Sequence, residues 1–328
     1  MRRPLAALAA LILGFAPLAA PLAAPSVAAA QVIVPGAQGD AAIDHMRVAT
    51  EAAERVTSLL VKVASDPAYA GARTPDEMSA AIAAMRGDLA SSRREIQDIV
   101  RRLNSLPRVA GEADPVELRL VDRVVVDIAR FSAGVDELLA AVEGLGDALT
   151  AGDQARIEQS ATALVRGSVA VIEAQSLMLR ARLPMVPSDS SSYAQVTSLA
   201  CFYEGFAAFQ RGTLNLVRPE DAGAGMERAV GCMTGENTRG QAAIEREVSV
   251  DHQDPRLNGI RDGLAPVHLA MFKELEGAAA MMDEARRALL RGDSVASLMK
   301  YADRTTEFEQ RFQVLVSQEV DVVERQGR

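Results

Sequence analysis

The sequence predicts an all-α protein made of long antiparallel helices, and three observations lead to that prediction. Apolar residues recur three or four positions apart along nearly the whole chain after Asp40, which places them on one stripe of a helix. Helix-start and helix-stop residues interrupt this pattern only about every 25 to 35 residues. No stretch alternates apolar and polar residues in the manner of a β-strand.

Four helices are expected in a first bundle, residues 40–184. The first covers about 41–65. The second begins at Thr74-Pro75-Asp76-Glu77, where Thr74 can cap the helix and Glu77 can complete a capping box. Asp114-Pro115 predicts the start of the third in the same way, and Gly152-Asp153 separates it from the fourth. The fourth ends at Leu183-Pro184, and a linker follows over 185–192.

A second bundle, residues 193–328, is expected to contain four more helical segments, over about 192–216, 219–250, 256–290 and 293–325. Asp254-Pro255 and Gly292-Asp293 each lie 140 residues after their counterparts in the first half. This spacing suggests an internal duplication, although helix ends draw on few residue types and can match by chance. The eight helices form either two four-helix units or one elongated bundle.

The N-terminal residues have the order of a secretory signal peptide. Arg2 and Arg3 precede an apolar segment, and three alanines stand before Gln31, so cleavage is expected after Ala30. A membrane anchor is disfavoured because three prolines break the apolar segment. We expect a flexible lead-in over 31–39 and a mature protein without a transmembrane anchor, located in the periplasm or secreted.

The charge balance bears on the kind of partner. The chain has 35 Lys plus Arg and 44 Asp plus Glu, a formal net charge of −9. Residues 1–30 contain two arginines and no acidic residue, so the remaining chain would have a net charge of −11. An acidic protein is a poor partner for nucleic acid or for anionic membrane surfaces. The abundance of alanine and arginine is typical of GC-rich bacteria.

The two cysteines are expected to join a helical hairpin. If the chain reverses at Val217-Arg218-Pro219, Cys201 lies 17 residues before Arg218 and Cys232 lies 14 after it. Partners in an antiparallel hairpin lie at similar distances from the turn, so a disulfide fits this spacing. Free buried thiols and a redox-active pair remain alternatives, although a redox pair usually has a Cys-x-x-Cys spacing, which is absent.

An aromatic stripe lies on the first arm of this hairpin. Together with a nearby arginine it forms the candidate ligand pocket, which consists of Phe202, Tyr203, Phe206, Phe209 and Arg211. The same residues are equally suited to fill a helical core, so a pocket and simple packing both remain open.

Metal and catalytic chemistry find little support in the sequence. Asp251, His252 and Asp254 are the densest group of metal-ligand residues, yet they stand where one helix ends and Asp254 can cap the next. The methionines occur mostly on apolar stripes, which favours core packing over copper binding. No motif for a nucleophilic serine, a phosphate loop or covalent haem attachment is present, and we expect no cofactor.

The sequence therefore favours a non-catalytic binding or scaffolding protein of the bacterial cell envelope, with protein partners. A periplasmic small-ligand sensor with its site near 193–212 is the first alternative. A metal carrier or enzyme that uses the few histidines is the second.

Overall fold

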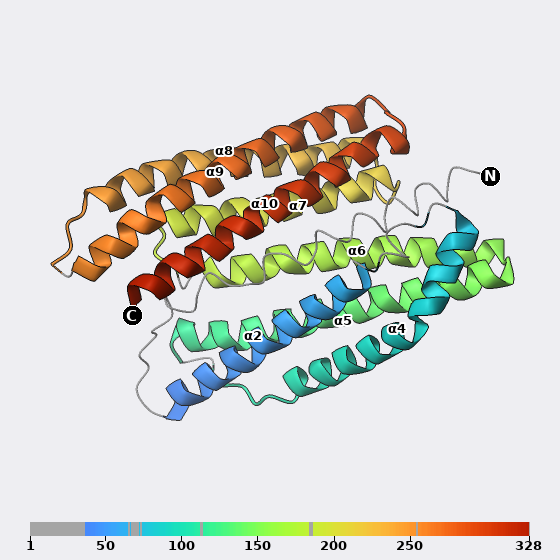
Figure 1. Ribbon diagram of the computed structural model, residues 1–328, viewed down its shortest axis with the longest axis horizontal. Coiled ribbons are helices and arrows are strands. Elements are labelled where there is room, and N and C mark those ends of the chain that lie inside the picture. The colour runs from blue at the N-terminus through green and yellow to red at the C-terminus, as the bar shows by residue number, and fades with distance from the viewer. Residues whose placement is uncertain are drawn as a thin grey trace. The chain divides into compact units, whose positions relative to one another are not determined.

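The computed structural model describes residues 37–64, 66, 72, 74–111, 114–183, 186–253 and 255–327, which form eight α-helices and no strand. The all-α prediction is therefore confirmed. The helices are α2 (Ala37–Ala64), α4 (Pro75–Asn104), α5 (Val116–Ala151), α6 (Gln154–Arg182), α7 (Ser191–Thr213), α8 (Pro219–Ser249), α9 (Pro255–Leu290) and α10 (Val295–Gly327) (Figure 1). The predicted signal peptide, residues 1–30, and most of the predicted lead-in lie outside the described residues.

The helix ends follow from local side-chain chemistry. Thr74 and Glu77 form the predicted capping box, in which each side chain accepts from the other residue's backbone N–H. The prediction for Asp114 was wrong, because Pro115 occupies the cap position without a side-chain cap. The Asp114 carboxylate accepts from the N–H of Gly111 instead. The rigid φ of Pro115 starts α5 in place of a hydrogen-bonded cap.

Two glycines end helices in the left-handed region, 140 residues apart as the sequence suggested. Gly152 follows α5 with a φ of 63°, and Gly292 follows α9 with a φ of 74°. In both turns the glycine and the following aspartate donate backbone N–H groups to matching carbonyls of the preceding helix. The two turns are thus alike in geometry, while the predicted duplication stays a prediction.

The described chain divides into two compact units. Unit 1 contains α2, α4, α5, the part of α6 up to Gln175, and Ser294–Asp303. In this unit α4 and α5 run antiparallel, since Ser79 contacts Thr150 and Arg93 contacts Asp136. Their fully buried side chains form an apolar core together with α2, and include Val56, Leu89, Ile96, Phe131 and Leu145.

Unit 2 contains the end of α6 from Ser176, the helices α7, α8 and α9, and α10 from Arg304. Helix α10 runs antiparallel to α9, because Arg304 pairs with Glu284 and Arg311 with Glu274. These helices lie side by side in Figure 1. Large buried side chains of the unit come from α7, α8, α9 and α10, and they include Phe202, Tyr203, Met226, Phe272 and Phe308. The predicted linker at 185–192 and the predicted bundle limits stay predictions.

One helical segment, Gln154–Ala181, is apolar and long enough to cross a membrane by composition alone. In its most apolar window, 61% is buried inside the protein, as in the core helix of a soluble protein, so this segment is only weak evidence for a span.

Candidate functional site

The predicted pairing of the two cysteines is confirmed. Cys201 lies on α7 and Cys232 on α8, with their sulfur atoms 2.02 Å apart, at disulfide distance, and their Cα atoms 6.2 Å apart. Helix α7 ends at Thr213 and α8 begins at Pro219, so the chain reverses close to the predicted turn. Asn215 adopts a φ of 55° within this turn. The pair therefore joins the two arms of an antiparallel hairpin.

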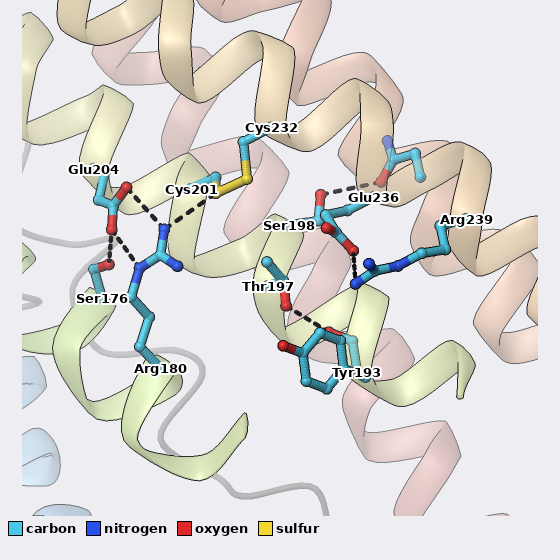
Figure 2. The surroundings of a disulfide bond; sticks show 11 residues. Ser176, Arg180, Tyr193, Thr197, Ser198, Cys201, Glu204, Cys232, Glu236 and Arg239 are labelled. Carbon is cyan, nitrogen blue, oxygen red and sulfur yellow. Dashed lines mark hydrogen bonds and ion pairs between the residues drawn. A yellow bond between two sulfur atoms is a disulfide. The ribbon is translucent and has the colours of Figure 1, made fainter. Parts of the chain in front are cut away.

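The surroundings of the pair differ between its two sulfur atoms (Figure 2). Cys201 on α7 is 1% exposed, whereas Cys232 on α8 is partly exposed. Arg180 of α6 donates from Nη2 to the Cys201 sulfur at 3.4 Å and to a Glu204 oxygen at 3.0 Å. The Glu204 hydrogen bond raises the pKa of Arg180 above its ordinary value, so the guanidinium stays charged.

The aromatic residues of the candidate pocket are all buried in unit 2. Phe202 stacks on Phe206 and lies 4.7 Å, centroid to centroid, from Phe308 of α10. Tyr203 packs edge-on against Phe202, and Phe206 stacks on Phe209. The fifth candidate, Arg211, is partly exposed at the end of α7. The rings thus form part of the core, and a ligand pocket beside them stays a prediction.

A buried carboxyl group lies next to this aromatic core. Glu309 of α10 and Tyr203 of α7 interact, but no hydrogen bond of normal geometry reaches the Tyr203 hydroxyl or either carboxyl oxygen within the described residues. Burial raises the pKa of Glu309 well above its ordinary value of 4.5, and the Tyr203 hydroxyl lowers it by a smaller amount. Burial therefore favours the neutral form of Glu309. We call these two residues the tyrosine–glutamate pair.

A second buried polar group connects α7, α8, α9 and α10 in unit 2. His268 of α9 places Nδ1 3.1 Å from Oγ of Ser191 and Nε2 3.2 Å from Oε1 of Glu319. Ser191 in turn donates its hydroxyl and its backbone N–H to the two carboxylate oxygens of Glu247, both at 2.7 Å. Ser191 comes from α7, Glu247 from α8 and Glu319 from α10. We call these four residues the histidine network.

The hydrogen-bond direction at Ser191 follows from the geometry of the histidine network. Ser191 has one hydroxyl proton, and it donates this proton to Glu247. Its oxygen then accepts from Nδ1–H of His268, while Nε2 of the same ring faces Oε1 of Glu319.

Serine, histidine and glutamate in line are also the residues of many nucleophilic hydrolases. In this network, however, Glu247 accepts both the hydroxyl and the backbone N–H of Ser191. Ser191 is 1% exposed, so a substrate carbonyl does not reach its oxygen in this arrangement. The geometry suits a connection between helices better than the activation of a nucleophile.

The weak metal candidates lie in the connection between α8 and α9. Asp251 Oδ1 accepts from Asn258 Nδ2 at 2.9 Å, and the His252 backbone N–H donates to Asn258 Oδ1 at 2.8 Å. Asp254, the third candidate, lies outside the described residues. No group of three or more His, Cys, Asp or Glu side chains suited to a metal ion occurs in the described part of the chain. A metal site at this connection stays a prediction.

Sequence reasoning placed Tyr203 in the candidate pocket, but it missed Glu309 and the histidine network. The members of the two buried polar groups are far apart in the chain, so no local spacing reveals them. One signal was present, because His268 falls on the apolar stripe of α9 with Met271, Phe272 and Leu275. A histidine on a buried stripe needs polar partners from the helices that pack against it.

Comparison with known proteins gives no match, whether to a protein-family model, to a curated protein or to a solved structure.

Proposed function

We propose that the chain is an exported, non-catalytic helical protein of the bacterial cell envelope that binds a protein partner. The cysteine pair supports the compartment, since disulfides persist in oxidising environments such as the periplasm. The signal-like order of residues 1–30 supports the same location. The acidic net charge favours a protein partner over nucleic acid.

The observation that carries the binding proposal is a group of exposed apolar side chains where α8 meets α9. Val248, Val250 and Leu257 are 44%, 49% and 48% exposed. We call these three residues the apolar tip. Exposed apolar side chains that gather at one place are typical of protein-interaction sites.

The backbone at the apolar tip is held in place by side chains. Asn258 donates from Nδ2 to the backbone carbonyl of His252 at 2.9 Å, and Arg261 donates to the carbonyl of Val250. An ordered connection loses little conformational entropy when a partner binds. The apolar tip is therefore suited to a rigid protein–protein contact.

The experiment compares two variants of the full chain purified from its own periplasm. Val250→Asp combined with Leu257→Asp should abolish co-purification of a stoichiometric protein partner. Leu269→Asp is the matched control, because Leu269 is also 48% exposed but lies three turns further along α9. A partner that is lost equally from both variants, or from neither, contradicts binding at the apolar tip.

The compartment has a separate test in the same preparation. The intact mass should correspond to a chain that begins at Gln31, and the two cysteines should not react with a thiol reagent before reduction. A cytoplasmic chain that keeps residues 1–30, or one with two reactive thiols, contradicts the export proposal.

A small-ligand sensor is the second candidate, and the tyrosine–glutamate pair is the observation that favours it. Buried polar atoms that lack hydrogen bonds of normal geometry can be satisfied by a bound molecule. Native mass spectrometry of the protein from its own periplasm should then show a small molecule that is absent from the Glu309→Gln variant. If the small molecule is bound to both proteins or to neither, this candidate is contradicted.

A further inference from the structure

The two cysteines of the pair differ in exposure and in charge environment. Cys201 is almost completely buried and accepts a hydrogen bond from Arg180, whereas Cys232 is partly exposed. We propose that Cys232 is a thiol-exchange site, at which a small external thiolate attacks and forms a mixed disulfide while Cys201 leaves as a thiolate. This inference does not depend on the partner that binds the apolar tip.

The surface of α8 beside Cys232 supports attack at that sulfur. Gly231 and Gly235, one residue before and three residues after Cys232, are both exposed and lie beside open space. Apart from the adjacent residues and the nearby backbone of α8, no heavy atom lies within 4 Å of the place a Cβ would take. Side chains on a helix cover the turn that precedes them, so a side chain at position 235 would cover Cys232. The two glycines leave this approach open.

The charges around Cys201 support its role as the leaving group. A guanidinium within hydrogen-bond distance stabilises a thiolate relative to a thiol, and a more stable thiolate leaves faster. Glu204 weakens this effect, because Arg180 also donates to both of its carboxylate oxygens. Glu236, four residues after Cys232, is a second acid that acts on Arg180, and burial raises the pKa of its carboxyl group above the ordinary value.

The reaction balances without any further reagent. The thiolate forms a bond to the Cys232 sulfur, the bond between the two protein sulfurs breaks, and its electron pair leaves on the Cys201 sulfur. The products are a mixed disulfide on Cys232 and a thiolate on Cys201. Attack by Cys201 on the mixed disulfide reverses the step. Attack by a second external thiolate releases Cys232 and gives an external disulfide and the reduced protein.

Glutathione is the probe for the site of attack. The native full chain is incubated with glutathione at neutral pH, exchange is stopped with acid, and the adduct is mapped by peptide mass spectrometry. The adduct is expected on Cys232. An adduct mainly on Cys201, or exchange that proceeds only at the rate of global unfolding, overturns the proposal.

Two charge variants distinguish exchange chemistry from loosening of the fold. Arg180→Gln removes the cation beside Cys201 and should slow exchange roughly three- to tenfold. Glu204→Gln removes the carboxylate that competes with the Cys201 sulfur for Arg180, and it should accelerate exchange by a similar factor. Both variants break the same ion pair, so loosening of unit 2 would accelerate exchange in both. Changes in the same direction overturn the role assigned to Arg180.

A third variant tests access. Gly235→Leu places a side chain over Cys232 in open space and should slow glutathione exchange severalfold, while it raises helix propensity by about 1 kcal/mol. Its thermal midpoint should be unchanged or higher, which excludes unfolding as the cause of any change in rate. Gly277→Leu is the matched control, because Gly277 also lies in open space on a helix of unit 2. An unchanged rate in Gly235→Leu, or an equal decrease in the control, overturns attack at Cys232.

Discussion

The histidine network and the tyrosine–glutamate pair are two buried polar groups in the same unit, and helix α7 supplies a hydroxyl to each. Ser191 gives its proton to Glu247 and accepts from His268, so each group in the network has a partner. Tyr203 and Glu309 meet in an aromatic core without a hydrogen bond of normal geometry. Hydrogen-bond partners, and not the extent of burial alone, should therefore decide whether a buried polar residue stabilises or destabilises the unit.

The largest effect is expected from the loss of His268. His268→Phe keeps the volume of a ring but leaves Glu319 and Ser191 without their shared partner, and it should lower the free energy of unfolding by about 3 kcal/mol. Urea denaturation at pH 7 measures this loss.

The matched control for this variant is His252→Phe. His252 is exposed in the connection between α8 and α9, so its replacement should change stability by less than about 0.5 kcal/mol. If the two variants lose equal stability, the histidine network is not a stabilising element.

Glu309 should show the opposite behaviour, with a definite dependence on pH. Its pKa in the folded protein lies above its value in the unfolded chain, so folding holds a proton that the unfolded chain releases. The contribution of Glu309 to the free energy of unfolding is fully present below its pKa in the unfolded chain, near 4.5. This contribution is lost as the pH rises toward the pKa of Glu309 in the folded protein. Glu309→Gln removes this loss, and should therefore stabilise the protein by about 1 kcal/mol or more at pH 8.

Thermal unfolding of the wild type and Glu309→Gln at pH 4.5 and pH 8 checks this sign. The difference between the two proteins should be larger at pH 8. Glu274→Gln serves as a control, because Glu274 pairs with Arg311 at the surface of the same unit. A Glu309→Gln variant that is less stable than the wild type at pH 8 contradicts a raised pKa for the buried Glu309 carboxyl group.

The helices and the cysteine pair were accessible from the sequence because their signals are local. Thr74 and Gly152 mark helix ends by their own local conformational preferences. The pairing of Cys201 with Cys232 follows from the similar number of residues that separates each cysteine from the turn. The histidine network was not accessible. Ser191 and Glu319 both reach His268 only after α7, α9 and α10 have packed in one particular register. The apolar stripes alone do not fix that register, because a shift by a whole helical turn keeps the same stripe in contact.

The smallest effects come from deleting one hydroxyl from each buried group, and their signs give the sharpest comparison. Ser191→Ala leaves Glu247 and His268 without the oxygen that joins them, so it should cost about 1–2 kcal/mol. Tyr203→Phe removes a hydroxyl that has no hydrogen-bond partner of normal geometry, so it should be neutral or stabilise by about 0.5 kcal/mol. Both residues lie on α7 and are almost fully buried, so depth alone predicts the same sign for both. Denaturation curves at pH 7 decide between the two explanations. If Tyr203→Phe costs as much as Ser191→Ala, the Tyr203 hydroxyl has a partner in solution, and the contrast between the two groups is lost.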